Sequence, residues 1–356
     1  MILSHTTCTY SNTNIHKEIF TMTQTIDHKL GSTNMMTSSK TVLLRALDAI
    51  SQAEQDGLMP GTENSVLSGY SGNKLVGTLQ RLTRIFKDDP TACYLEVGVF
   101  QGLTLLSVAN ATKTFPCFGI DNFAKYDPHK HNQSIVDQRI KSLSLSNANL
   151  INSDYEDAFD TLDTWLGGKK LAVYFIDGPH DYRSQLMCLE LAVPYLHQDA
   201  IILVDDSNYQ HVRQANRDFL KTHPEYKLLF DSYTDSHPMN MSKEDEAIAR
   251  KGWWDGINIL VRDSSNQLPV SYPPTERSRR LFENENDLQA MRTAEIAPQA
   301  ALMIQSILEL NLFRFAVNGV RFAKEAWTSK GMWMKRFRVA NTYSKDLPRS
   351  RYNRPK

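Results

Sequence analysis

The sequence predicts an α/β fold in which a mostly parallel β-sheet carries helices on both faces. Short apolar runs alternate with helical segments between residues 92 and 263, as in successive strand–helix units. The runs are continuously apolar and do not alternate with polar residues, which is typical of strands covered on both faces.

Seven apolar runs supply the predicted strands: 92–98, 117–121, 148–154, 172–178, 200–206, 226–233 and 256–263. Each of the first five ends in, or runs straight into, a polar or acidic residue. The carboxyl ends of parallel strands line the ligand crevice of such sheets, so we expect the chemistry at that edge.

The chain divides into segments of different composition. We predict a disordered extension, a helical lid or cap, a main domain and a helical extension with a basic tail, at residues 1–38, 39–89, 90–263 and 264–356. In the lid, Gly69 and Gly72 are candidate pivots.

Composition favours a soluble cytoplasmic protein. The 40 basic and 40 acidic residues cancel, so no overall charge attracts nucleic acid or membrane. The four cysteines have no metal-binding spacing and are expected as free thiols in a reducing compartment. The chain start lacks the apolar stretch of a signal peptide, and no window has the roughly 20 apolar residues of a membrane helix.

The first predicted strand enters a glycine loop and then a helix, in "YLEVGVFQGLTLLSVA". Gly98 and Gly102 let the backbone approach a ligand at the helix start. Asp121 ends the second strand, where an acid can bind ribose hydroxyls. Glu96 replaces the first glycine of the dinucleotide fingerprint; its carboxylate would repel a pyrophosphate but suits a ligand with an amino group and a sulfonium.

This E-x-G-x-x-x-G pattern resembles motif I of class I S-adenosylmethionine-dependent methyltransferases. The resemblance implies a Rossmann-like, seven-stranded sheet whose last strand is antiparallel. It also implies S-adenosylmethionine as cofactor, with the methionine part near the glycine loop, the ribose near Asp121 and the adenine near Asp154. The expected cofactor-binding residues are Glu96, Gly98, Gly102, Asp121, Asp154 and Asp177.

Carboxylates end the fourth and fifth strands. Asp177 follows the fourth, and Asp205 and Asp206 follow the fifth. Neighbouring strands lie about 4.8 Å apart, so these acids would repel one another unless a cation joined them. Mg²⁺ prefers such oxygen ligands. Asp205 and Asp206 can converge only if the chain bends there, because successive side chains on a strand point to opposite faces.

His180 follows Asp177 in the turn "DGPHDY". Methylating a hydroxyl requires removal of its proton, and histidine titrates near neutral pH, so His180 is the candidate general base. The alternative is that His180 caps the next helix.

The turn and the "VDD" strand end together resemble the metal-dependent sugar and macrolide O-methyltransferases of the macrocin type. The resemblance covers roughly residues 70–263 and implies His180 and Asp177 as catalytic residues, with Asp177, Asp205 and Asp206 as metal ligands. Pro179 departs from the small polar residue usual in that turn. The implied acceptor is a hydroxylated small molecule, a glycoside or another natural product. Candidate substrate contacts are Tyr182, Tyr209, Trp253 and Trp254.

Two other functions stay open at this point. An N-methyltransferase would act on an amine without a metal, because a neutral amine is already nucleophilic. A non-catalytic protein of the same fold would bind nucleic acid through its basic tail, where twelve Lys and Arg stand against two acids from Arg314 onward. Helical spacing of Phe313, Val317 and Val320 instead suggests docking on the domain or on a partner subunit, as in a homo-oligomer.

Overall fold

The computed structural model describes residues 36–124, 127, 129–235, 241–276, 285–339 and 347–355. Almost all of the predicted N-terminal extension, 1–38, lies outside these residues, so its disorder stays a prediction. The first described helix, α2, spans Met36–Asp56.

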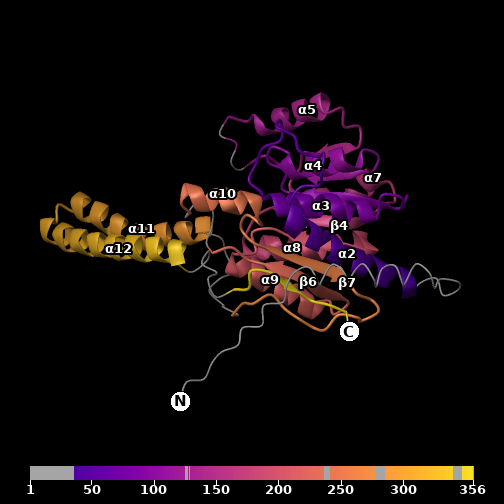
Figure 1. Cartoon of the computed structure of the whole chain (residues 1–356). Coiled ribbons are helices and arrows are strands. Elements are labelled where there is room, and N and C mark those ends of the chain that lie inside the picture. Colours follow the sequence, from indigo (N-terminus) through magenta and orange to yellow (C-terminus); the bar gives the residue numbers. More distant parts are fainter. Residues whose placement is uncertain are drawn as a thin grey trace, which may run out of the picture.

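The α/β fold is confirmed (Figure 1). The sheet has eight strands in the order β3-β2-β1-β4-β5-β7-β6-β8. β7 pairs antiparallel with both β5 and β6, and β8 pairs antiparallel with β6. The strands are β1 Ala92–Val97, β2 Cys117–Ile120, β3 Ala148–Ile151, β4 Lys170–Ile176, β5 Leu196–Val204, β6 Tyr226–Ser232, β7 Ile257–Arg262 and β8 Arg351–Tyr352. The seven predicted runs are the first seven of these.

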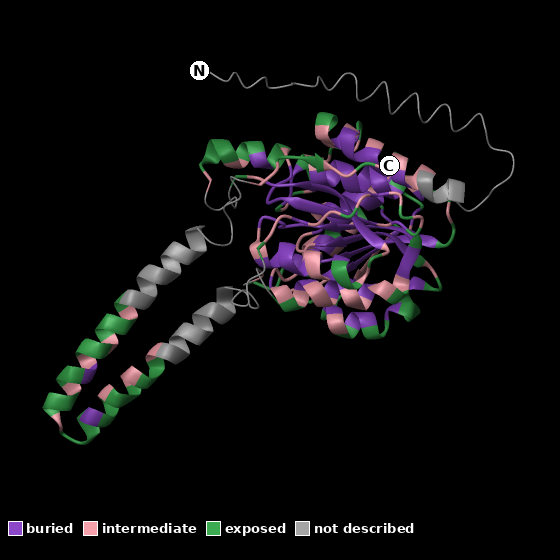
Figure 2. Ribbon diagram, turned by 90° about the horizontal axis from the view of Figure 1, so that it is seen from below, coloured by how far each residue is buried: buried purple, intermediate pink, exposed green. Residues whose placement is uncertain are grey.

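Helices cover both faces of the sheet, and each face has its own apolar core (Figure 2). One core joins the sheet to α2, α3 and α4, and the other joins it to α6, α7, α8 and α9. The bounds are α3 Asn73–Ile85, α4 Leu103–Thr112, α5 Asn132–Ser142, α6 Tyr155–Asp160, α7 Leu162–Leu166, α8 Tyr182–Ala192 with a 3-10 turn at Val193–Tyr195, and α9 Gln210–Thr222. Covering both faces explains the continuously apolar strands.

The eighth strand places part of the predicted basic tail on the edge of the sheet. Arg351 donates two hydrogen bonds to the carboxylate of Asp231, which is completely buried in β6. The ring of Tyr352 packs 4.8 Å from that of Phe230, and its hydroxyl donates to Glu54 on α2. A charge-assisted, bidentate pair of this kind fixes the strand on the sheet edge. Arg351 is therefore committed to the fold and not available to nucleic acid.

Three further helices lie beyond β6. α10, Lys243–Lys251, occupies the polar connection between β6 and β7. α11, Glu285–Leu308, and α12, Leu312–Val339, form a helical hairpin that projects away from the sheet (Figures 1 and 2). Residues 264–276 of the predicted helical extension are irregular instead. None of the described helices is long and apolar enough to cross a membrane.

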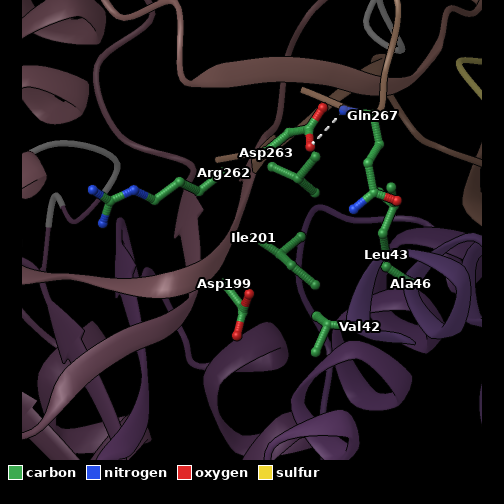
Figure 3. Close-up of a pocket in the computed structure, with 9 residues that line it drawn as sticks. Val42, Leu43, Ala46, Asp199, Ile201, Arg262, Asp263 and Gln267 are labelled. Carbon is green, nitrogen blue, oxygen red and sulfur yellow. Dashed lines mark hydrogen bonds between the residues drawn. The ribbon is translucent and has the colours of Figure 1, made fainter. Parts of the chain in front are cut away.

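A small cleft lies at the amino edge of the sheet, where α2 meets β5 and β7 (Figure 3). Its lining includes Val42, Leu43, Asp199 and Arg262, and Asp263 accepts a hydrogen bond from the backbone of Gln267 nearby. The carboxylates that end β4 and β5 lie at the opposite edge, so this cleft is separate from the chemistry considered next.

Candidate active site

The ends of β4 and β5 bring the predicted carboxylates together. The backbone amide of Asp205 donates to the carbonyl of Ile176, which extends the pairing of the two strands by one residue. Asp206 then adopts φ +52°, in the left-handed region. This is the bend that the sequence required, and it turns the Asp206 side chain toward β4.

Asp177, His180 and Asp206 form a compact group. Each offers a ligand atom, and these atoms all lie within 4.8 Å of one another. Nε2 of His180 lies 2.8 Å from Oδ2 of Asp206. The imidazole also stacks on the ring of Tyr209, with the centroids 5.6 Å apart and the planes 8° apart. Asp181, not His180, caps helix α8 by accepting from the amide of Ser184. The capping alternative for His180 is therefore wrong.

Asp205 lies beneath this group and is almost completely buried. Its Oδ1 has no hydrogen-bond partner among the described residues. Burial, followed by repulsion from Asp206, raises the pKa of Asp205 well above its usual range. Burial and then Asp205 do the same to the pKa of Asp177. Without a cation the protonated forms of these acids are therefore favoured, and a bound cation would favour the charged forms instead.

A fourth acid, Asp255, joins the cluster and was not predicted. It lies just before β7 and is completely buried. Asn208 donates to its Oδ1 at 2.8 Å, while burial and then Asp206 raise its pKa well above the usual range. β7 is antiparallel, so the residue that precedes it lies at the same edge as the residues that follow β4 and β5.

The glycine loop after β1 lies directly against Asp177. Gly98 has φ +93°, and a Cβ atom added to it would lie 1.8 Å from the backbone carbonyl oxygen of Asp177. Gly102, at φ +82°, precedes the first residue of α4. Gly98 is thus required for contact between two strand ends, in addition to the predicted approach of a ligand.

Glu96 is completely buried on the α4 side of β1. Its carboxylate accepts from the hydroxyl of Tyr94 at 2.6 Å and from Oγ1 of Thr104 at 3.1 Å. Burial raises the pKa of Glu96 to about 8. Glu96 therefore ties β1 to the start of α4 beneath the loop.

Asp121 and Asp154 lie where the second and third strands end. Oδ2 of Asp121 accepts from the amides of Val99 and Phe100 at 2.9 and 2.7 Å, so Asp121 fixes the glycine loop. Asp154 caps α6 and is exposed. A carboxylate offers about four acceptor positions, so both keep capacity for ligand hydroxyl or amino groups.

The aromatic candidates separate into core and surface residues. Trp253 is buried against Phe230, with the ring centroids 5.2 Å apart, and belongs to the core. Tyr182 donates its hydroxyl to Asp218 on α9. Tyr209 stays at the site because it stacks on His180. Trp254 lies under Arg250, whose guanidinium is 4.7 Å from its ring centroid.

Within the predicted lid, α2 and α3 pack in the core, and the connection between them contacts the glycine loop through Tyr70. Tyr70 is 62% exposed, and its ring lies 5.4 Å from that of Phe100 and 6.2 Å from that of Trp254. Gly72 packs so closely that an added Cβ would lie 2.1 Å from the carbonyl oxygen of Gly252. The glycine at this position is required for close packing. The sequence did not indicate that Tyr70 and Phe100 would meet.

Comparison with known proteins agrees with this geometry. Residues 95–207 match the model of a family described as methyltransferase domain. The matched residues include the glycine loop and the carboxylates after β4 and β5, so the match supports an S-adenosylmethionine-dependent methyltransferase. Comparison with curated protein sequences finds no match.

Solved structures with similar folds include three methyltransferases. The O-methyltransferase from Bacillus cereus in complex with SAH is 15% identical, with 68% of this chain and 99% of that chain covered and a TM-score of 0.40. The O-methyltransferase TomG from Streptomyces achromogenes is 15% identical, with 61% of this chain and 89% of that chain covered and a TM-score of 0.39. The methyltransferase PaMTH1 from Podospora anserina is 12% identical, with 72% of this chain and 98% of that chain covered and a TM-score of 0.36. At these scores the similarities add nothing to the assignment.

Proposed function

We propose that this chain is an O-methyltransferase that transfers a methyl group from S-adenosylmethionine to a hydroxyl of a small molecule and requires a divalent cation, Mg²⁺. The observation on which the proposal depends is the convergence of Asp177, His180 and Asp206 beside the glycine loop. Their position at the carboxyl edge of the sheet and their carboxylate and imidazole groups suit metal-assisted methyl transfer.

The chain offers a donor site along the glycine loop. Gly98 brings the loop against the end of β4, Gly102 precedes α4 with φ +82°, and Asp121 orients the loop amides. S-adenosylmethionine supplies an activated methyl group on a cationic sulfur. The surrounding carboxylates favour a cation over a pyrophosphate, because a second anion beside them would be repelled.

The residues at the edge fit a hard divalent cation. Asp177 and Asp206 provide oxygen ligands, and Asp177 keeps part of its surface open to solvent. Asp205 and Asp255 are buried close by, and a bound cation would favour their charged forms. A bound divalent cation would lower the pKa of a coordinated acceptor hydroxyl. Asp205 is therefore proposed as a supporting charge and a ligand candidate behind Asp177 and Asp206.

His180 is the group proposed to accept the proton of the acceptor hydroxyl. Its Nε2 contacts Oδ2 of Asp206 in this structure. To act as the base, this nitrogen must leave Asp206 and contact the acceptor hydroxyl. Stacking on Tyr209 fixes the plane of the ring, and Asp206 would stabilise the imidazolium that forms. The same position would allow His180 to be a ligand instead, and the two roles make different predictions.

Calorimetric titration tests the donor and the cation separately. S-adenosylhomocysteine is titrated into the protein with Mg²⁺ and then with EDTA, and Mg²⁺ is titrated alone. We expect nucleotide binding in both conditions and a Mg²⁺ site that Asp206→Asn loses. Asp199→Asn, which alters a buried acid at the opposite edge, is the matched control and should keep the site.

His180→Gln distinguishes base from ligand. As a base, His180 contributes about 10²–10⁴-fold to kcat, and its replacement leaves Mg²⁺ affinity unchanged. A parallel loss of Mg²⁺ affinity would assign it to the ligand set. Activity toward a panel of hydroxylated acceptors should disappear in EDTA. Methylation that persists in EDTA would indicate an amine acceptor, and absence of nucleotide binding would refute the enzyme proposal.

A further inference from the structure

The hairpin of α11 and α12 exposes an unusual amount of apolar surface. Leu308 is 80% exposed, Phe313 79%, Val320 70% and Trp327 82%. Scattered exposed apolar residues are ordinary, but a contiguous patch of large side chains on a projecting element marks an interaction site. This surface has no place in the methyl-transfer chemistry.

One side of α12 packs against α11. This inner row consists of Asn311, Phe315, Asn318, Phe322 and Ala326, which are buried or half-buried. Asn318 donates to Oγ of Ser306 at 3.1 Å and to the carbonyl of Leu302 at 3.3 Å, both on α11. The inner row therefore joins the two helices of the hairpin.

A second row runs along the other side of α12. This outer row consists of Phe313, Val317, Val320, Lys324 and Trp327, at steps of four and three residues. Such spacing, about one apolar residue every 3.5, is the seam of a helix that packs against another helix. The outer row lies on the side of α12 away from the inner row and is exposed. α12 thus has two seams, of which the hairpin uses one.

α11 has an exposed row of the same kind. Ala297, Ala301, Ile304 and Leu308 follow one another at steps of four, three and four residues, and all are exposed. Ile304 is 60% exposed. A helix that is apolar on more than one side is normally buried in a larger bundle. Both helices of the hairpin therefore have room for additional helices.

The charges of the hairpin are uneven along its length. Residues 285–339 contain eight basic and five acidic residues, and four of the basic ones, Lys330, Lys335, Arg336 and Arg338, lie in the last third of α12. Nearer the tip, residues 296–327 contain three basic and two acidic residues, and Arg314 and Glu309 pair there at 3.3 Å. Two copies of this nearly neutral segment therefore repel each other little.

The outer row offers enough area for a small interface between two helices. Its four large apolar side chains, Phe313, Val317, Val320 and Trp327, are 36–82% exposed and offer roughly 500 Å² on each copy. Two copies would together bury roughly 1,000 Å², the lower limit for a specific interface. We propose that a second copy of this chain docks here, so that the two α12 helices pack against each other through their outer rows.

Sedimentation velocity of the full chain tests this proposal. The chain has a mass of 40.6 kDa, so a dimer has twice that, about 81 kDa. We expect the dimer at micromolar concentration, and the monomer for a double variant, Ile304→Glu with Val320→Glu, which places a carboxylate in each exposed row. Arg321→Glu introduces the same carboxylate beside the outer row and should remain dimeric. Circular dichroism verifies that each variant keeps its helices.

Three results would overturn the proposal. A wild-type chain that is monomeric at tens of micromolar has no such interface. A dimer that survives in the double variant uses another surface. A monomer that floats with neutral phosphatidylcholine vesicles would assign the apolar rows to a lipid surface instead.

Discussion

Replacing Gly98 with alanine should damage the site more than the conformation of that residue alone can explain. Gly98 has φ +93°, and its missing Cβ would lie 1.8 Å from the carbonyl oxygen of Asp177. An alanine must therefore push apart the ends of β1 and β4. Asp177, the residue that follows β4, would move with its strand.

Gly168 provides a control for the conformational part. Its φ is +83°, and an added Cβ would meet nothing within 4 Å. Gly168→Ala should cost about 1–2 kcal/mol, the penalty of a left-handed alanine. Gly98→Ala should cost about 1–3 kcal/mol more, because overpacking adds to the same penalty. At about 2–4 °C per kcal/mol, the melting temperatures of the two variants should differ by several degrees.

The assays are thermal unfolding and Mg²⁺ titration on both variants. Gly168→Ala should keep Mg²⁺ affinity, and Gly98→Ala should weaken it because Asp177 is displaced. If Gly98→Ala is no less stable than Gly168→Ala and binds Mg²⁺ as the wild type does, the strand ends are not in contact as described.

Three other predictions concern buried charges. Burial raises the pKa of Glu96 from 4.5 to about 8, so the folded chain is stabilised by the bound proton at low pH and loses that stability as pH rises from 4.5 to 8. The free energy of unfolding in urea should therefore fall less between pH 5 and pH 8 for Glu96→Gln than for the wild type, and an equal fall would contradict this. Arg351→Ala should cost about 1–3 kcal/mol by leaving Asp231 buried without its cation, and adding Asp231→Asn should recover part of the loss, whereas no recovery would mean that the pair is unimportant. Burial and then Asp206 raise the pKa of Asp255, so Asp255→Asn should raise the melting temperature in EDTA more at pH 8 than at pH 5, because the wild-type chain loses stability as that proton is lost; an equal difference at both pH values would contradict this.

The sequence predicted the elements that repeat a simple pattern. Seven strands were visible as apolar runs because both faces of the sheet are covered. The positions of Asp177, Asp205 and Asp206 followed from the rule that parallel strands end at one edge. The bend at Asp206 was required by side-chain alternation, and its φ of +52° confirms it.

Other features could not be predicted from the sequence, because they depend on residues that are distant in the chain. Asp255 was overlooked because it precedes an antiparallel strand, and the pattern examined was of residues that follow strands. β8 has two residues, too few for any periodicity, and its position depends on Asp231, which is 120 residues away. Trp253 could not be assigned from sequence, since an aromatic residue beside the edge packs equally well inward on Phe230.

The pairing of β8 with β6 has a consequence for how the chain behaves before it is complete. All candidate cofactor, metal and catalytic residues precede β7, so the site can assemble from residues that emerge earlier than β8. Until β8 docks, the β6 edge presents unpaired backbone groups, which are a template for association with another chain. Shielding that edge against aggregation is therefore the task of a two-residue strand, and extensions that disturb it should reduce solubility before they reduce activity.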